Sequence, residues 1–80
     1  MNRTSLKALL DAEDVRDDLY GLYGHPGDET LCLERLADGW HVYYSERGLR
    51  TGERTYSTEH EACEFMASRL LADPSTRRER

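Results

Sequence analysis

The chain has 80 residues, of which 38% are hydrophobic and 34% are charged, and its formal net charge is −5. A chain of this length buries about 60–65% of the surface that its unfolded form exposes, which supports one core and excludes a second domain or a deep ligand pocket. Because the excess of acids would repel a polyanion, the charge disfavours nucleic acid as the main partner.

The cysteine content and the apolar runs bear on the compartment. Cys32 and Cys63 are too few for the disulfide framework of a small secreted protein. The first residues contain no apolar segment typical of a signal peptide, and the longest apolar runs, such as Ala8–Leu10, are far too short to cross a bilayer. We therefore expect a cytoplasmic protein with free thiols and no membrane contact.

The first element predicted along the chain is a helix that Thr4 or Ser5 caps and that ends near Glu13. Three leucines share one face of this helix: Leu6, Leu9 and Leu10. Residues 19–23 alternate like a short strand, and we expect an edge strand there. An extension of the first helix through residues 15–20 is the alternative, although it would bring several aspartates into like-charge pairs.

The clearest pattern lies between residues 31 and 45, after a turn predicted at His25–Asp28. Apolar and polar residues alternate on both sides of Asp38-Gly39, which indicates a hairpin with a type I′ turn that pairs Leu33 with Tyr44. One face is predicted to be apolar, with Leu31, Leu33, Trp40, Val42 and Tyr44. The opposite face is predicted to be half-exposed, with Cys32, Glu34, His41, Tyr43 and Ser45.

A loop over residues 46–52 and a short strand over residues 53–56 are expected next. Thr58–Glu61 is a capping box that begins a second helix, and Asp73-Pro74 ends it. Its buried face is predicted to consist of Ala62, Cys63, Met66, Ala67 and Leu70. The sequence thus predicts an α+β domain over residues 1–74: an N-terminal helix, three or four antiparallel strands in a meander and a C-terminal helix on one sheet face, followed by a basic, disordered tail over residues 75–80.

No catalytic or metal-binding pattern is present in the sequence. The three histidines fall in separate elements, and Cys32 and Cys63 face different sides, so no set has the spacing of a zinc site. Ser45 lies four residues from His41 on one strand, about 13 Å along it, which is too far for a hydrogen bond. We therefore expect no cofactor, no bound metal and no enzymatic activity.

The strongest charge feature is a run of acids that we call the acidic segment, residues 11–18. Its aspartates are Asp11, Asp14, Asp17 and Asp18. Such a run is commonly a solvated face, and the sharper hypothesis is a docking surface that steers a basic partner. His41 and Tyr43 on the half-exposed sheet face would then anchor the partner.

The stretch from Gly39 to Gly48, followed by Tyr56 to Cys63, resembles small bacterial proteins that are similar to immunity proteins of toxin systems; the resemblance covers residues 31–74. The order of elements also resembles the arm-binding domains of phage integrases and, more weakly, WGR domains. The sheet face lacks the basic residues of the former, and Trp40 lies seven residues from Arg47, so the WGR signature is absent.

Two functions follow as expectations. The first is a protein-binding module that inhibits a basic toxin or nuclease by occlusion, as the immunity-type resemblance implies. The alternative is an accessory nucleic-acid-binding domain that uses Arg47, Arg50 and Arg54. The identity of the partner and the oligomeric state are not encoded in any pattern of the sequence.

Overall fold

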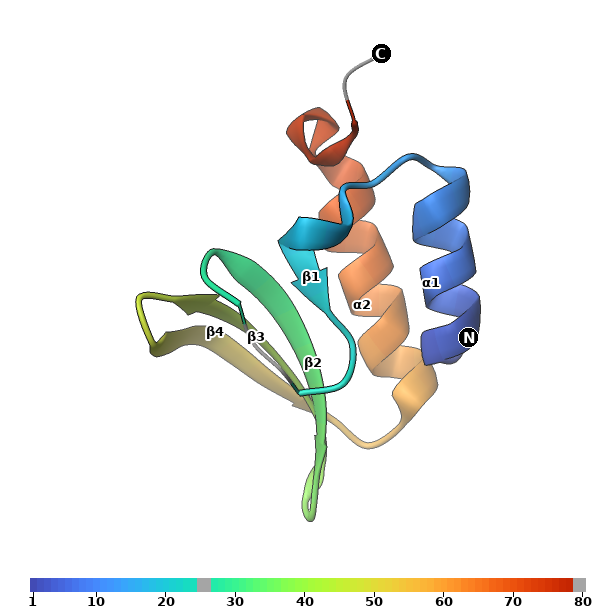
Figure 1. Ribbon diagram of the computed structural model, residues 1–80. Coiled ribbons are helices and arrows are strands. Elements are labelled where there is room, and N and C mark those ends of the chain that lie inside the picture. The colour runs from blue at the N-terminus through green and yellow to red at the C-terminus, as the bar shows by residue number, and fades with distance from the viewer. Residues whose placement is uncertain (25–26, 79–80) are drawn as a thin grey trace.

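The computed structural model describes residues 1–24 and 27–78. Helix α2 (Glu59–Ala72) covers one face of a four-stranded sheet, and α1 (Arg3–Ala12) packs beside α2 (Figure 1). The strands lie side by side in chain order: β1 (Tyr20–Gly21), β2 (Thr30–Leu36), β3 (Gly39–Glu46) and β4 (Leu49–Tyr56). Two 3₁₀ turns, η1 (Asp17–Leu19) and η2 (Pro74–Thr76), precede β1 and follow α2. The predicted α+β class is confirmed.

Helix α1 begins earlier than the sequence suggested. Its cap is Asn2, whose side chain accepts a hydrogen bond from the backbone N–H of Ser5 at 2.8 Å. The Ser5 hydroxyl in turn accepts from the Asn2 N–H at 2.9 Å, so the two residues form a reciprocal capping box. The prediction of Thr4 or Ser5 as the cap is therefore wrong, because Ser5 fills the third helical position of the same motif.

The edge strand predicted at residues 19–23 is present but shorter and differently oriented. Strand β1 holds only Tyr20 and Gly21, and it pairs parallel to β2, with Tyr20 opposite Leu31. The segment after β1 carries the chain back to the start of β2, so the two strands run the same way and the meander is not wholly antiparallel (Figure 1). The turn predicted at His25–Asp28 falls partly on residues 25 and 26, which lie outside the described residues.

The β2–β3 hairpin exists, but its register differs from the predicted one. Leu33 pairs with Val42 rather than with Tyr44, and the two-residue loop consists of Ala37 and Asp38. Neither loop residue has a positive φ, so the type I′ turn predicted at Asp38-Gly39 is wrong. A Cβ on Gly39, which has φ 138°, would lie 2.7 Å from the carbonyl oxygen of Tyr56, so glycine is required where β4 passes β3.

A type I′ geometry occurs instead in the next hairpin, where the sequence suggested a loop. Arg47 and Gly48 connect β3 to β4 with φ values of 53° and 78°. Strand β4 begins at Leu49 and contains one extra residue, because Gly52 and Glu53 together oppose Tyr43 of β3. This bulge turns Arg50 and Glu53 toward the same face of the sheet.

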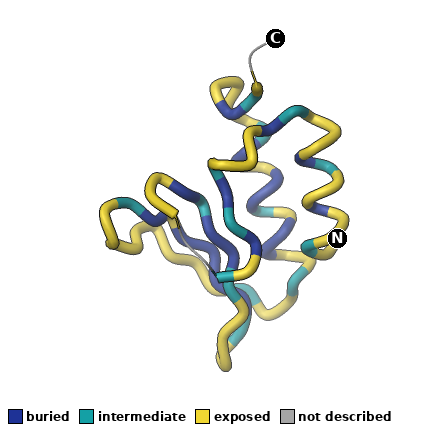
Figure 2. The backbone as a smooth tube through the Cα atoms, in the orientation of Figure 1, coloured by how far each residue is buried: buried dark blue, intermediate teal, exposed yellow. Residues whose placement is uncertain are grey.

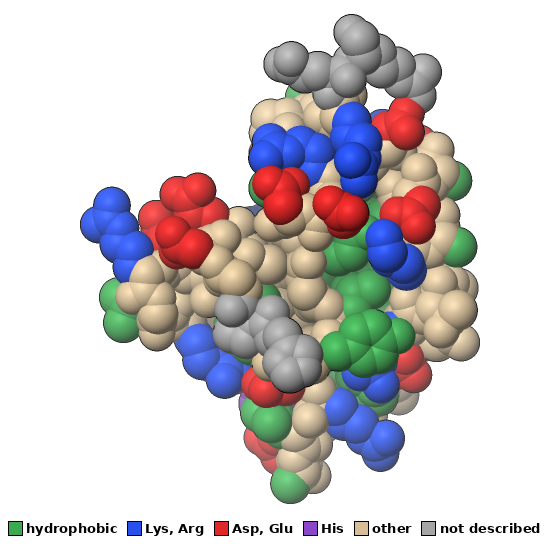
Figure 3. All heavy atoms as spheres, viewed as in Figure 1, with side chains coloured by type: hydrophobic (Ala, Val, Ile, Leu, Met, Phe, Trp, Pro, Cys, Tyr) green, Lys and Arg blue, Asp and Glu red, His purple; other side chains and the backbone are tan. Residues whose placement is uncertain are grey.

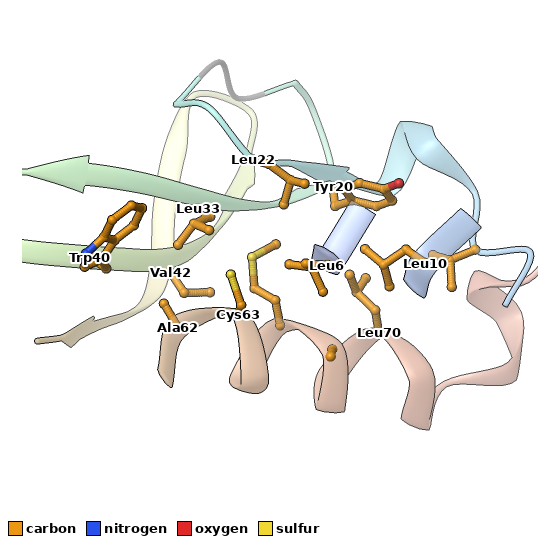
Figure 4. Close-up of a cluster of buried hydrophobic side chains, with 13 residues drawn as sticks. Leu6, Leu10, Tyr20, Leu22, Leu33, Trp40, Val42, Ala62, Cys63 and Leu70 are labelled. Carbon is orange, nitrogen blue, oxygen red and sulfur yellow. The ribbon is translucent and has the colours of Figure 1, made fainter. Parts of the chain in front are cut away.

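The core lies between α2, α1 and the helix-side face of the sheet (Figure 4). All five residues predicted for the buried face of α2 are buried, as are Leu6 and Leu10 of α1. Thr58 caps α2 as predicted, since its hydroxyl accepts from the N–H of Glu61 at 3.2 Å. Figure 2 shows that burial is greatest in β2, β3 and α2, whereas β4 is exposed along its length. Within the described ranges, no helix is long and apolar enough to cross a membrane.

The sheet face opposite the helices is not half-exposed, and that prediction is wrong. Cys32 and Tyr43 are 0% and 1% exposed, and His41 and Ser45 are also buried. The guanidinium of Arg50 lies over the Tyr43 ring, 3.7 Å from its centre, because the bulge in β4 directs Arg50 across the sheet. A cation from the neighbouring strand therefore covers this face in place of a second layer of helices.

The expected disorder of residues 75–80 is wrong for residues 75–78. The hydroxyl of Thr76, which is buried, donates to the carbonyl of Leu70 at 2.7 Å. Val15 and Arg77 form an isolated antiparallel bridge, and the N–H of Arg16 donates to the carbonyl of Thr76 at 2.8 Å. The C-terminal segment thus ties the end of α2 to the chain that follows α1. Residues 79–80 lie outside the described residues.

Replacement of Gly39 with alanine should destabilise the protein more than replacement of Gly48. Both positions have positive φ, which costs an alanine about 1 kcal/mol, but only Gly39 has a backbone atom in the path of the new Cβ. We expect a clearly lower urea midpoint for Gly39→Ala and a smaller shift for Gly48→Ala. Equal shifts in the two unfolding curves would contradict the close approach of β3 and β4.

Replacement of Thr58 with alanine should lower the free energy of unfolding by about 1 kcal/mol, because the first turn of α2 loses its cap. Ser57→Ala is the matched control, since Ser57 donates only to the Glu61 carboxylate, at 3.1 Å on the surface. Chemical denaturation of both variants measures the difference. A larger loss in Ser57→Ala would place the start of the helix one residue earlier.

Candidate functional site

The acidic segment lies at the end of α1 and in η1, and bases of the same chain balance most of its charge. The ion pairs are Lys7–Asp11 at 2.7 Å, Arg16–Asp18 at 2.7 Å, Arg78–Asp17 at 3.5 Å and Arg77–Glu13 at 3.7 Å. Asp14, with φ 59°, accepts the N–H of Arg78 at its backbone carbonyl. Although Asp11, Asp17 and Asp18 are exposed, the segment is not an unbalanced negative surface.

His41 and Tyr43, the predicted aromatic anchors, are not available on the surface. Tyr43 is covered by Arg50, and His41 is held between two carboxylates. Its Nε2 lies 2.7 Å from Asp38 and its Nδ1 lies 2.6 Å from Glu53. Their part as partner contacts stays a prediction, but the exposure on which it depended is wrong.

The two carboxylates determine the chemistry of His41. Hydrogen bonds to Asp38 and then to Glu53 raise the pKa of His41, and the same contact lowers the pKa of Asp38. Because both ring nitrogens are occupied, the imidazole offers no free lone pair to activate a nucleophile. The arrangement therefore ties the β2–β3 loop to β3 and β4. The Glu53 carboxylate also binds Arg50 at 3.1 Å, so the same network reaches the arginine that lies over Tyr43.

The three arginines of the nucleic-acid alternative do not form one surface. Arg47 lies in the β3–β4 turn, where its backbone N–H donates to Asp28 at 2.7 Å. Arg50 lies on the face away from the helices, and Arg54 lies on the opposite face, with its guanidinium 4.9 Å from the centre of the Phe65 ring. A continuous basic track for a phosphate backbone is therefore not assembled from these residues.

The cysteines have no shared environment. Cys32 lies in β2 and Cys63 in the core face of α2; both are buried free thiols, and burial raises the pKa of each. Over residues 1–24 and 27–78, no group of three or more histidines, cysteines and acids has a geometry that could hold a metal ion.

A cleft that the sequence did not indicate lies between the end of the sheet and the C-terminal end of α2. We call it the Tyr44 cleft. It has a volume of about 370 Å³ and an apolar floor formed by Leu19, Leu31 and Leu70. Tyr44 of β3 is 37% exposed at its edge. In Figure 3 a notch separates this end of the sheet from the helices, and acidic and basic side chains both lie beside it.

Three carboxylates surround Tyr44. Partial burial and then the charges of Glu46, Glu29 and Asp28 raise the pKa of the Tyr44 phenol. The register of β2 and β3 ends at the pair Thr30 and Ser45, and Glu29 and Glu46 follow these two residues at the same end of the sheet. Neither glutamate forms an ion pair within the described part of the chain, so this end of the sheet holds a like-charge pair that repels itself.

The sequence did contain a signal for this site. Glu29 precedes β2 and Glu46 ends β3, so the observed hairpin register leaves both at the same end of the sheet, whereas the predicted register placed Gly48 opposite Glu29. Glu29 has φ 53°, and this left-handed backbone fixes its position beside the cleft. The lining also includes two arginines, Arg16 and Arg69, and the Arg69 guanidinium lies 5.9 Å from the centre of the Phe65 ring.

The pH dependence of stability should report the His41 contacts. The folded pKa lies above the unfolded value of about 6.5, so the stabilisation is fully present below that pH and is lost as the pH rises through the folded pKa. The advantage of wild type over His41→Gln in urea unfolding should therefore shrink as the pH rises from about 6 to 8. His60→Gln, at an exposed site on α2, is the control. An advantage that grows over this range would contradict the bridging role.

The Tyr44 cleft and the two glutamates beside it are thus the surface feature that the intramolecular contacts leave unsatisfied. Comparison of the chain with protein-family models, with curated proteins and with solved structures finds no match. The function must therefore be argued from this geometry.

Proposed function

We propose that this chain is a non-catalytic protein-binding module that binds a basic partner at the Tyr44 cleft. The observation that carries the proposal is that Glu29 and Glu46 both lie near Tyr44 and that neither forms an ion pair with another described residue. Like charges that lie close together repel each other and destabilise the free protein, and a cation from a partner would reduce that repulsion. The chain's net charge of −5 also favours a positively charged partner.

The shape of the cleft supports a lysine or arginine side chain as the contact. The apolar stem of such a residue can lie on the floor formed by Leu19, Leu31 and Leu70 while its charged head reaches the carboxylates that line the cleft, Glu29 and Asp73. Tyr44 offers apolar area together with a hydroxyl at the rim, a combination that is common at the centre of protein interfaces. One basic side chain would thus satisfy the charge, the floor and the rim together.

The proposal keeps the predicted positive charge of the partner but assigns the contact to different residues of this chain. The acidic segment is balanced by Lys7 and by arginines, and Tyr43 lies under Arg50. An inhibitory role, in which this chain covers a basic site on a toxin or nuclease, is the form of binding to test first. No observation favours the nucleic-acid alternative, because Arg47, Arg50 and Arg54 are divided between the two faces and a turn.

The test compares two double variants as bait in a lysate of the source organism. Glu29→Gln with Glu46→Gln removes the unsatisfied charge, whereas Asp17→Asn with Asp18→Asn removes the same charge from the acidic segment. Wild type and the Asp17/Asp18 variant should capture the same basic protein, and the Glu29/Glu46 variant should not. With the purified partner, the Glu29/Glu46 variant should associate several-fold more slowly, and salt should slow wild type more than this variant.

Each outcome decides the matter. Glu29→Gln with Glu46→Gln should unfold at an equal or higher urea concentration than wild type, because it removes repulsion, so a loss of capture is not a loss of fold. Loss of capture by the Asp17→Asn with Asp18→Asn variant would place the binding site in the acidic segment instead. Capture that is indifferent to both double variants, or a partner that is acidic, would refute the proposal.

A further inference from the structure

The helix-side face of the sheet continues past the helices that cover it. Along this face the exposed fraction rises from 1% at Val42 to 37% at Tyr44 and 66% at Leu49. Tyr44 and Leu49 lie on the same face because Tyr44 pairs with Thr51, and Leu49 comes two residues before Thr51 in β4. We call the surface formed by Tyr44, Leu49 and Thr51 the open sheet end.

Helix α2 leaves the open sheet end uncovered because it meets β4 near the opposite end of that strand. The Phe65 ring of α2 lies 5.8 Å from the Tyr56 ring and 4.9 Å from the Arg54 guanidinium. Tyr56 is the last residue of β4, whereas Leu49 is its first. In Figure 1 the β3–β4 turn projects away from α2. The Tyr44 cleft lies in the space between, with Tyr44 on the sheet and Leu70 on α2 in its lining.

The open sheet end and the cleft form one apolar strip. Tyr44 and Leu49 are diagonal neighbours across β3 and β4, a relation that puts side chains about 7–8 Å apart and within reach of an aromatic ring. The strip continues into the cleft over its leucine floor. An apolar surface that is contiguous rather than scattered, and that charged residues border, is typical of a protein interaction site.

Carboxylates border this strip at the end of the sheet. Glu29 and Glu46 lie near Tyr44, and neither forms an ion pair with another described residue. The arginines of the cleft belong to the other side: Arg69 to α2, and Arg16 to the chain after α1, where it pairs with Asp18 at 2.7 Å. A segment that lies on the strip would thus meet negative charge where the sheet ends.

We propose that the open sheet end and the Tyr44 cleft bind one amphipathic helix of the partner, an inference that rests on the proposed function. The apolar stripe of that helix packs against Tyr44 and Leu49, and its lysines or arginines lie near Glu29 and Glu46. Residues i and i+4 of a helix are about 6 Å apart along its axis, which is comparable with the spacing of diagonal strand neighbours. The bound helix extends the layer that α1 and α2 form over the sheet.

A helix fits this surface better than an extended segment does. Strand β3, which carries Tyr44, lies inside the sheet, and its backbone pairs with β2 on one side and with β4 on the other. An extended segment that crosses the face would therefore find no ladder to join, and its own backbone groups would stay unpaired. A helix satisfies its backbone hydrogen bonds internally and needs only side-chain contacts.

The probe is a synthetic peptide of leucine, lysine and alanine, blocked at both ends and about 14 residues long, with its leucines at helical spacing. The intact chain labelled with ¹⁵N is the sample. Titration should shift amides near residues 44–51 and 69–73. A peptide of the same composition with leucines at every second position should bind about tenfold more weakly. Equal binding of the two peptides, shifts that centre elsewhere, or no shifts up to about 1 mM peptide would overturn the inference.

Leu49→Thr removes the exposed apolar contact and should weaken binding of the helical peptide about fivefold. Leu36→Thr is the matched control and should bind normally, because Leu36 is also an exposed strand leucine, at the opposite end of the sheet. Both variants should unfold near the urea midpoint of wild type, since both side chains are exposed. Unchanged binding by Leu49→Thr would refute the helix contact.

The double variant Glu29→Gln with Glu46→Gln separates this inference from the proposed function. Weaker binding by this variant and by Leu49→Thr supports both proposals. Loss in Leu49→Thr alone would keep the helix contact and refute the charge-dependent contact with a basic partner. Loss in the glutamate variant alone, with equal affinity for the two peptides, would keep the basic partner and refute the helix.

Discussion

Arginine guanidinium groups lie over aromatic rings on both faces of the sheet, and they shield these rings from solvent where no helix covers them. Two helices cover one face of the sheet, and too little chain is left to cover the other. Arg50 lies over Tyr43 on that second face, while Arg3 and Arg35 lie 5.0 and 5.4 Å from the centre of the Trp40 ring in the helix-side core. Such contacts contribute about 0.5–1 kcal/mol each at exposed sites, and they exclude water where no further element is available.

The sequence predicted the parts of the fold that follow from local spacing and missed the burial of Tyr43, which depends on Arg50 of the neighbouring strand. Periodicity correctly gave both helices, the buried face of α2 and the hairpin, because these follow from local spacing. The hairpin register was offset by two residues, yet Leu33 and Val42 remained on the core face because an even offset preserves sidedness. The burial of Tyr43 was not predicted because it depends on the bulge in β4 that directs Arg50 over the ring, and no local sequence pattern indicates that bulge.

The candidate site was missed for a related reason. A run of acids is evident in the sequence, but two of the bases that pair with it, Arg77 and Arg78, come from the other end of the chain. Conversely, Glu29 and Glu46 are 17 residues apart in the sequence, and the pairing of β2 with β3 leaves both at the same end of the sheet, near Tyr44. Charge patterning therefore drew attention to the segment that the fold neutralises. The expectation of a basic partner rests on the net charge of −5 and stays a prediction.

The extra residue in β4 has a consequence for how any partner can engage this sheet. Gly52, with φ 60°, interrupts the straight edge of β4, and charged side chains flank it at Arg50, Glu53 and Arg54. At the other edge, β1 offers only two residues. Neither margin presents a ladder long and flat enough for another strand to join. Strand addition at these two margins is therefore disfavoured, and the irregularity in β4 that opposes it is the same one that brings Arg50 over Tyr43.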